Sequence, residues 1–353
     1  MRCAKCKGTA QVEVRRHHTA FCGPHFLEWF EAQVDRAVRR ERMFTPQDRV
    51  LVAVSGGKDS LVLWDVLLRL GYRASGLHLN LGIGAYSQES QEKCEAFARD
   101  RGAELLVVDI PAEYGVGVEG LAQLTGRVAC SACGLSKRYL FNRVALDRGF
   151  SVVATAHNLD DEAAVLLGNL IAGNVDALVR QAPVLESTHP GLVKKVKPLY
   201  RIAERETAAY AVLRGIDYVL DECPNSVGAR SLLLKEALNL LERDAPGTKQ
   251  NLYWNFLEKI RPLLRETSPG PALRSCAHCG QPTTGEVCAF CRMTERVTHS
   301  LRVRTAAPGD LAPEPVGALG ALPGGPSGEE GRAPRPSRRN SWGSLVNPSS
   351  DRR

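Results

Sequence analysis

The feature that most constrains the fold is a strand, a glycine-rich loop and a helix in immediate succession. The apolar run Val50–Val54 predicts a buried strand, and Ser55-Gly56-Gly57-Lys58-Asp59-Ser60 follows it directly. Two adjacent glycines let the backbone turn sharply and point successive N–H groups into a concavity, and the helix N-terminus adds positive potential. The pattern predicts a phosphate-binding loop. It is not a Walker loop, which has four residues between its first glycine and Gly-Lys.

Short apolar runs alternate with amphipathic stretches between residues 48 and about 265. Strands alternating with helices at this spacing predict an α/β fold with a parallel sheet covered on both faces. The expected strands are 49–54, 74–79, 104–109, 151–156 and 195–198; the expected helices are about 59–70, 87–101, 134–148, 160–172, 203–214 and 229–243.

An acidic segment, His157–Ala163, comes directly after the fourth expected strand. Its carboxylates, Asp160, Asp161 and Glu162, start a helix, where acidic side chains interact favourably with the dipole. One interpretation is helix capping alone. The other places the segment beside the phosphate loop at the carboxyl ends of adjacent strands, in one nucleotide crevice where a carboxylate can hold Mg²⁺.

The chain has 11 cysteines and only 3 methionines. No run of 18 apolar residues and no apolar signal core after Met1 is present, so we expect neither a membrane span nor secretion. We therefore expect a cytoplasmic protein, in which thiols stay reduced and this many cysteines indicate metal rather than disulfides.

Two terminal cysteine sets have the spacing of tetrahedral zinc ligands. They are Cys3-x2-Cys6-x15-Cys22-x2-His25 and Cys276-x2-Cys279-x8-Cys288-x2-Cys291. Each set is complete and has no open position, which predicts two structural Zn²⁺ ions. We expect zinc-binding modules at 1–25 and 270–300, a linker helix within 26–47, a catalytic domain at 48–265 and, from its proline and glycine content, a disordered tail at 304–353.

Four cysteines remain outside these sets. Cys94 lies on an expected helix and is assigned a packing role, whereas Cys130 and Cys133 lie in a loop before a helix, and Cys223 precedes a proline. A lone Cys-x-x-Cys pair is also typical of redox sites. Three thiolates can instead hold three corners of a 4Fe–4S cluster and leave the fourth iron open. Spacing alone leaves both interpretations standing.

The phosphate loop resembles the PP-loop of the N-type ATP pyrophosphatases. The chain is similar over about residues 1–295 to the tRNA 2-thiouridine synthetases of the TtuA type. The similarity rests on this loop together with Cys130–Tyr139, His157–Ala163, Cys223-Pro224 and the terminal zinc sets. The cytosolic wobble-uridine thiolases are close relatives, while the tRNA cytidine thiolases lack the zinc ends. Ala129 stands where relatives often have proline.

The resemblance implies an ATP-dependent tRNA sulfurtransferase with a PP-loop fold. In this family ATP adenylates the C2 oxygen of a uridine, and AMP leaves as sulfur enters. Cys130, Cys133 and Cys223 would hold a 4Fe–4S cluster whose open iron binds sulfide, and Lys137 and Asp161 are the catalytic candidates. The implied ATP-binding residues, with Mg²⁺, are Ala53, Ser55, Gly56, Gly57, Lys58, Asp59, Ser60, Leu79, Lys137 and Thr155.

The same resemblance implies three partners: tRNA, a ubiquitin-like sulfur-carrier protein with a C-terminal thiocarboxylate, and a second copy of the chain in a homodimer. The net charge of +7 suits an acidic partner. Basic residues are plausible phosphate contacts, although charge runs are usually solvated faces. These residues are Arg15, Arg16, Arg36, Arg39, Arg40 and the run Lys194-Lys195-Val196-Lys197.

The sequence leaves the target position open. We favour uridine 54 of the T loop, because the whole motif set lies in one chain, over the wobble uridine 34 and cytidine 32. Two other classes remain as alternatives. A lysine-adding PP-loop tRNA ligase gives no reason for Cys130, Cys133 and Cys223 together, and the intact loop from Ser55 to Ser60 argues against a non-catalytic zinc-finger RNA-binding protein.

Overall fold

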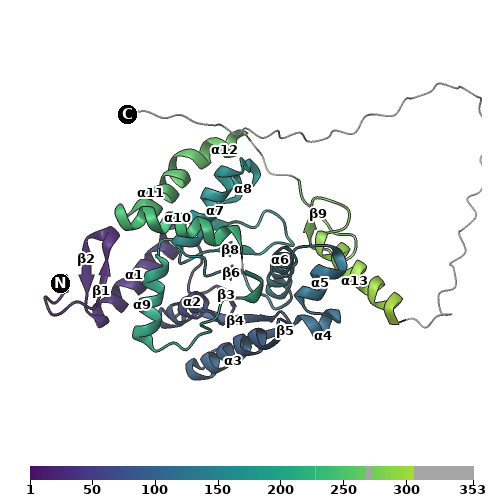
Figure 1. The fold of residues 1–353 in the computed structure, drawn as a ribbon, viewed down its shortest axis with the longest axis horizontal. Coiled ribbons are helices and arrows are strands. Elements are labelled where there is room, and N and C mark those ends of the chain that lie inside the picture. The colour runs from purple at the N-terminus through teal and green to yellow at the C-terminus, as the bar shows by residue number, and fades with distance from the viewer. Residues whose placement is uncertain (227, 268–271, 306–353) are drawn as a thin grey trace, which may run out of the picture. The chain divides into compact units, whose positions relative to one another are not determined.

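A six-stranded sheet forms the centre of the computed structural model, which describes residues 1–226, 228–267 and 272–305 (Figure 1). The strand order is β5-β4-β3-β6-β8-β7, and all neighbours are parallel except β7, which runs antiparallel to β8. The strands are β3 (Arg49–Val54), β4 (Arg73–Asn80), β5 (Leu105–Asp109), β6 (Val152–Ala154), β7 (Val184–Leu185) and β8 (Lys194–Val196). The parallel sheet expected from the sequence is confirmed, and β7 is an edge strand that the sequence did not predict.

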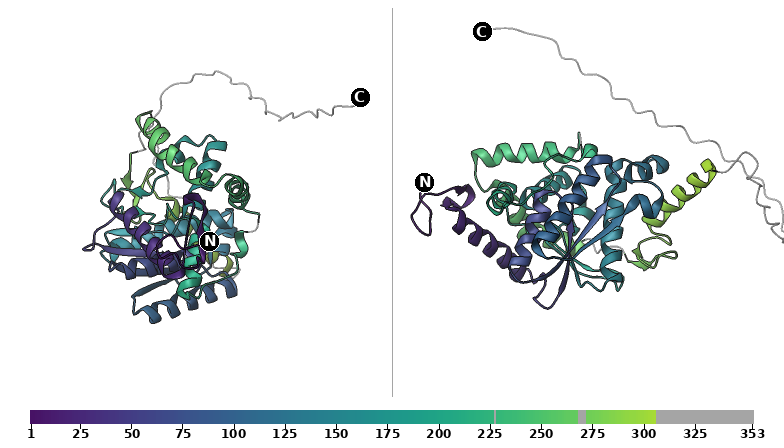
Figure 2. Two further views of the ribbon diagram at one scale, coloured as in Figure 1. Left: turned by 90° about the vertical axis from the view of Figure 1, so that its left-hand side faces the viewer. Right: turned by 90° about the horizontal axis from the view of Figure 1, so that it is seen from below.

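Side chains of β3 alternate between two hydrophobic cores, as a strand buried on both faces requires. Val50 and Val52 pack in the first core, and Leu51 packs in the second. Helices α1 (Gly23–Arg40), α2 (Lys58–Arg69), α3 (Gly84–Arg101) and α9 (Glu204–Arg214) contribute to the first core. Helices α4 (Ile110–Tyr114), α5 (Val118–Thr125), α6 (Ala129–Asp147) and α13 (Ala289–Thr305) contribute to the second. Figure 2 shows the twisted sheet between these helices.

A third group of helices packs beyond the end of β6. Helix α7 contacts α8, α10 and α11, and α12 packs on α8. These elements are α7 (Leu159–Ile171), α8 (Val175–Arg180), α10 (Arg230–Asp244), α11 (Thr248–Asn255), a π-helical turn (Phe256–Ile260) and α12 (Arg261–Thr267). None of the described helices is both long and apolar enough to cross a membrane.

The two cysteine modules lie at opposite ends of the described chain (Figure 1). The N-terminal module is a hairpin of β1 (Val12–Val14) and β2 (Thr19–Phe21) joined by the 3₁₀ turn η1 (Arg15–His17), and the C-terminal module pairs β9 (Arg274–Ser275) with β10 (Pro282–Thr283). Helix α1, expected as a linker, begins at Gly23, and its apolar face is buried in the first core. Helix α13 continues to Thr305, two residues into the range expected as a tail; the remainder of that range, 306–353, lies outside the described residues.

Asp65 is a fully buried carboxylate that joins three helices. It accepts hydrogen bonds from Arg101 of α3 at 2.8 Å, and from Arg214 and Tyr210 of α9 at 3.0 Å each. Burial alone would raise the pKa of Asp65, but the two arginines outweigh burial and lower it below its ordinary value of 3.8. The ionised carboxylate therefore stabilises the packing of α2, α3 and α9.

We predict that Asp65→Asn lowers the free energy of unfolding by about 3 kcal/mol at pH 7, because it leaves two partly buried guanidinium groups without their anion. The pKa of Asp65 is lower in the folded protein than in the unfolded chain. Its stabilising contribution is therefore complete at pH values above the ordinary pKa and is lost as the pH falls through the folded-state pKa. Urea unfolding of both proteins at pH 7 and pH 3 measures the difference. Asp147→Asn, at an exposed i,i+4 pair with Arg143, is the control and should change stability by less than about 1 kcal/mol. An equal effect of both substitutions would contradict the prediction.

Candidate active site

The turn between β3 and α2 has a backbone that only glycine adopts readily. Gly56 has φ +81°, and a Cβ atom there would lie 2.7 Å from the carbonyl oxygen of Ser90 in α3. Ser60 Oγ accepts a hydrogen bond from the Ser55 N–H at 3.1 Å and donates to the Gly57 carbonyl oxygen at 2.8 Å. The close approach of α3 and the serine hydrogen bonds hold the loop in one conformation at the N-terminus of α2.

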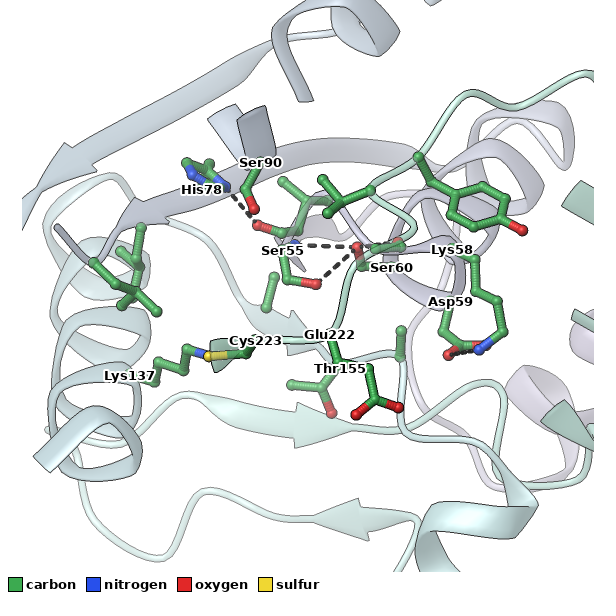
Figure 3. Close-up of a pocket in the computed structure, with 18 of the residues that line it drawn as sticks. Ser55, Lys58, Asp59, Ser60, His78, Ser90, Lys137, Thr155, Glu222 and Cys223 are labelled. Atoms are coloured by element: carbon green, nitrogen blue, oxygen red, sulfur yellow. Dashed lines mark hydrogen bonds and ion pairs between the residues drawn. The ribbon is translucent and has the colours of Figure 1, made fainter. Parts of the chain in front are cut away.

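A cavity of about 550 Å³ opens at this loop, at the carboxyl ends of β3, β4 and β6 (Figure 3). That volume is within the range of small-molecule sites. Twelve of the residues selected from the sequence line it: Ala53, Ser55, Gly57, Lys58, Asp59, Ser60, Leu79, Cys133, Lys137, Thr155, Asp161 and Cys223. Gly56 and Cys130 are not in the lining. Gly56 turns against α3, and Cys130 is exposed at the start of α6.

An ion-pair network crosses one wall of the cavity. Lys58 Nζ lies 3.0 Å from Asp59 and 2.7 Å from Glu204, and Lys235 Nζ of α10 lies 2.6 Å from Asp161 and 3.2 Å from Glu204. Burial opposes the charge on each lysine, but the carboxylates outweigh burial and raise both lysine pKa values. Glu204 therefore bridges the phosphate loop and α10.

Three carboxylates of this network face two lysines. Burial raises the pKa of Asp59, which also accepts a hydrogen bond from Thr207 Oγ1. Burial alone would raise the pKa of Glu204, but Lys58 and Lys235 outweigh burial and lower it. The excess of carboxylate over ammonium groups suits a divalent cation, because hard cations such as Mg²⁺ prefer oxygen ligands.

The three acidic residues that start α7 have different environments. Asp160 accepts from the Glu204 N–H and pairs with Lys249, while Glu162 binds Lys197 and Tyr253. Neither lines the cavity. Asp161 does line it, and its carboxylate also caps α7 by accepting from the Asn158 N–H at 3.1 Å. Capping therefore describes part of the role of Asp161, whereas the carboxylates on either side of it form buried structural contacts.

Lys137 and Cys223 point into the same cavity from different elements (Figure 3). Lys137 lies on α6, one turn after Cys133, and Cys223 comes just before the 3₁₀ turn η2 (Pro224–Ser226). Cys130 Sγ donates to the Asn225 carbonyl oxygen at 3.2 Å, which links the start of α6 to this turn. None of these three cysteines is in a disulfide. The free thiols of Cys133 and Cys223 line the cavity, and that of Cys130 contacts the turn that follows Cys223.

The three thiols are not gathered as the ligands of a single metal ion are. Among the described residues, only the two terminal sets bring three or more His, Cys or carboxylate ligand atoms within 4.8 Å of one another. The thiols of Cys130, Cys133 and Cys223 do not all lie within that distance. In a 4Fe–4S cluster each cysteine binds a different iron, so such a cluster requires wider spacing than zinc does.

Each terminal set gathers four ligand atoms as the spacing predicts. His25 Nδ1 lies 3.4 Å from Cys3 Sγ and 3.2 Å from Cys22 Sγ, and in the C-terminal set Cys276 and Cys291 are 4.0 Å apart. Burial opposes ionisation of Cys3, but backbone N–H groups outweigh it and lower the pKa of the thiol to about 5. The pKa of Cys276 is lowered to about 6 for the same reason. Each set therefore favours one thiolate of the kind that metals require. The pKa values of the neighbouring Cys22, Cys288 and Cys291 are instead raised, by burial and by the adjacent cysteines.

Cys94 and His278 lie outside the cavity and outside both terminal sets. Cys94 is buried in the first core, and burial raises its pKa to about 12. His278 contacts Glu295 and is not part of the C-terminal set. Cys94 is therefore an inert packing residue in this structure.

Sequence reasoning missed Glu204, Lys235 and His78. Glu204 is the first residue of α9 and Lys235 lies within α10, each among other charged residues, and no local signal marks them. His78 Nδ1 lies 3.1 Å from the Val54 carbonyl oxygen, which can only accept, so Nδ1 carries the proton. Burial lowers the pKa of His78, and its Nε2 has no partner among the described residues. His78 thus supports the strand end from which the phosphate loop begins.

We predict that Gly56→Ala destabilises the protein by about 2 kcal/mol and abolishes ATP binding. Left-handed backbone costs a non-glycine residue about 1–2 kcal/mol, and the new methyl group would press on Ser90. Gly57→Ala is the matched control, because Gly57 has φ −80° and its nearest contact would be Ser55 Oγ at 3.5 Å. Thermal unfolding and ATP titration measure both effects. Equal stability of the two variants would contradict the assignment.

The chain matches the PP-loop domain family over residues 27–232 and the N-terminal LIM domain of 2-thiouridine synthetase TtuA over residues 2–27. It is 58% identical over 315 residues to the tRNA-5-methyluridine(54) 2-sulfurtransferase of Thermus thermophilus, covering 89% of this chain and 98% of the relative. It is 41% identical to the enzyme of the same name from Pyrococcus horikoshii, covering 83% and 93% of the two chains.

A solved structure has the same overall fold. The U34-tRNA thiolase NcsA from Methanococcus maripaludis, with its 4Fe–4S cluster, superposes with a TM-score of 0.72 at 27% identity and covers 84% of this chain and 96% of its own. The overall fold of the chain thus agrees with that of this tRNA thiolase. The chain belongs to the TtuA-type family of tRNA-5-methyluridine(54) 2-sulfurtransferases.

Proposed function

We propose that this protein is an ATP-dependent tRNA sulfurtransferase that replaces the C2 oxygen of uridine 54 in the T loop with sulfur. The observation that carries the proposal is the single cavity shared by the phosphate loop, Lys137, Asp161, Cys133 and Cys223. ATP chemistry and sulfur chemistry need adjacent sites, because the activated oxygen must leave from the carbon that sulfur attacks. A lysine-adding ligase has no use for the thiols in that cavity.

The adenylation step uses the phosphate loop. The uridine C2 oxygen attacks the α-phosphorus of ATP, the bond to the β-phosphate breaks, and pyrophosphate leaves. Loop N–H groups and Lys58 stabilise the charge that develops on the phosphates. Asp59, Asp161 and Glu204 would hold Mg²⁺, which would supply further positive charge to the phosphates. Lys58 and Lys235 would then exchange a carboxylate partner for phosphate.

The second step exchanges oxygen for sulfur. Sulfur forms a bond to C2, the C2–O bond breaks, and AMP leaves with the oxygen. Lys137 neutralises the phosphate of the departing AMP, and Asp161 positions Mg²⁺. Backbone atoms at Ala53, Leu79 and Thr155, which line the same cavity, frame the adenosine.

Cys130, Cys133 and Cys223 hold a 4Fe–4S cluster in this proposal. When bound, such a cluster supplies a fourth iron position that is free for a sulfur ligand. The free thiols around the cavity support this assignment, as does the cluster of the thiolase from Methanococcus maripaludis. The four residues of each terminal set hold one structural Zn²⁺, and metal content measured on the purified protein tests this assignment.

Uridine 54 is preferred to uridine 34 because of the relatives. The proteins at 58%, 41% and 40% identity are all named for position 54, whereas the NcsA and cytoplasmic thiolation proteins are 30% identical or less. We further propose that sulfur arrives on a thiocarboxylated ubiquitin-like carrier, and that the enzyme is a cytoplasmic homodimer, as the family resemblance implies. Analytical ultracentrifugation and a reconstituted assay with the carrier test these two proposals.

We predict that deletion of the gene removes 2-thiolated 5-methyluridine from position 54 of tRNA and leaves thiolated nucleosides at positions 34 and 32 unchanged. Nucleoside mass spectrometry of digested bulk tRNA, followed by sequencing of one isolated tRNA, measures the loss. Complementation with the wild-type gene is the control. Loss at position 34 alone would favour the wobble thiolase, and no loss of any thiolated nucleoside would refute the proposal.

We predict that Cys223→Ala in anaerobically purified protein lowers iron and activity and leaves zinc near two ions per chain. The reason is that Cys223 is outside both terminal sets and lines the cavity. Cys94→Ala removes a buried thiol from the first core and should leave iron content unchanged. Iron, zinc and sulfide analyses measure the outcome, and full iron content in Cys223→Ala would rule out this residue as a ligand.

A further inference from the structure

A second cavity, of about 220 Å³, lies where the N-terminal hairpin meets the catalytic domain. We call it the arginine–tryptophan pocket. Its walls come from η1, from the exposed face of α1, from the segment that follows β8, and from α11. The residues that define it are Arg16, His17, Trp29, Arg36, Arg201 and Trp254.

The walls of the pocket are held together by one buried ion pair. Arg16 binds Glu206 of α9 through two hydrogen bonds of 3.0 and 2.7 Å, and it also binds Gln250 of α11 at 2.8 Å. Both partners of the pair are only about 5% exposed. The sequence analysis gave Arg16 as a plausible phosphate contact. In the structure its guanidinium instead binds the N-terminal hairpin to the catalytic domain.

Two other arginines of the pocket keep their charge uncompensated. Neither Arg36 nor Arg201 has a carboxylate within ion-pair distance in the part of the chain that the structure describes. The Arg201 guanidinium lies over the Trp254 ring, 4.1 Å from its centroid. By contrast, Arg39 and Arg40 of the same α1 face pair with Asp35 and Glu258. The free positive charge of this face is thus concentrated in the pocket.

The remaining groups suit an aromatic ligand with an anionic group. The Trp254 indole N–H has no partner among the described residues, although buried indoles usually find one. Burial, aided by Arg16 and Arg201, lowers the pKa of His17, so its ring is neutral. The volume is below the 300–1,000 Å³ or so that is typical of small-molecule sites, which favours one unit of a larger chain over a free metabolite.

We propose that the arginine–tryptophan pocket binds one unpaired nucleotide of the tRNA substrate, with its phosphate at Arg36 and Arg201 and its base against the indole rings. The inference rests on the proposed function, because it takes tRNA as the ligand. Stacking on aromatic rings together with arginine charge is how proteins hold single-stranded nucleic acid without reading its sequence. The pocket therefore fixes the position of the tRNA while the target uridine enters the active-site cavity.

The test compares tRNA binding of the full-length, metal-loaded wild type with Arg36→Gln, Arg201→Gln and the double variant. Fluorescence anisotropy with a labelled tRNA transcript gives Kd between 50 and 300 mM KCl. We expect Kd to rise about tenfold for each arginine and the slope of log Kd against log salt to fall by about 0.7 for each lost phosphate contact. Trp254→Phe should weaken binding by a smaller factor. The ATP Kd should not change.

Arg99→Gln is the control, because Arg99 is exposed on α3, outside the pocket. Wild-type Kd and salt slope in the double variant would overturn the inference, as would an equal loss in Arg99→Gln. Unchanged tRNA binding with weakened binding of the purified sulfur carrier would also overturn it. Arg36 is exposed and unpaired, so Arg36→Gln keeps the test valid if Arg201→Gln fails to fold. The proposed function fails separately, if the wild type neither binds nor thiolates tRNA.

Discussion

Strand β3 lies between β4 and β6, and the helices that accompany these neighbours are on opposite faces of the sheet. Helices α2 and α3, which follow β3 and β4, pack in the first core, whereas α6, which leads to β6, packs in the second. A crevice must open at the carboxyl end of β3, where the strand order reverses. The phosphate loop, Lys137 of α6 and Asp161 after β6 converge in that crevice because of this reversal. Gly56 permits the tight approach to α3 that the loop needs there.

The lysines and carboxylates in the crevice can exchange ion-pair partners. Lys58 and Lys235 both bind Glu204, and Asp161 binds Lys235 and caps α7. These contacts keep partly buried charges paired, which avoids the cost of an isolated ion. In the proposed reaction, a triphosphate with Mg²⁺ would offer the lysines an anion and the carboxylates a cation. The same side chains can therefore either pair with one another or bind the substrate.

Much of the fold was predictable because it depends on local patterns. All five expected strands occur within about two residues of the predicted ranges, as do four of the six expected helices. Helix α3 begins at Gly84 and α6 at Ala129, earlier than the expected residues 87 and 134. The expectation that Cys130 and Cys133 lie in a loop before a helix was therefore wrong, since both lie in the first turns of α6. The edge strand β7 was missed because a strand of two residues has no periodic hydrophobic pattern. Helix α1 was interpreted as a linker because the sequence shows that it has an apolar face but not which part of the protein packs against that face. In the site, the loop and the cysteine spacings were readable, whereas Lys235 and Glu204 were not, since each resembles any solvated charged residue in a helix.

The sequence by itself determined the local chemistry: the turn that needs glycine, the tetrahedral ligand spacing of the two terminal cysteine sets, and the odd cysteine left for packing. These depend on neighbours within a few residues. Only the tertiary structure decided which of three adjacent carboxylates faces the cavity. Asp160 and Glu162 instead bind residues far away in the chain, on α11 and directly after β8. It also decided which arginines are free, since Arg16 meets its anion 190 residues later. Charge pairing across such separations has no local signature.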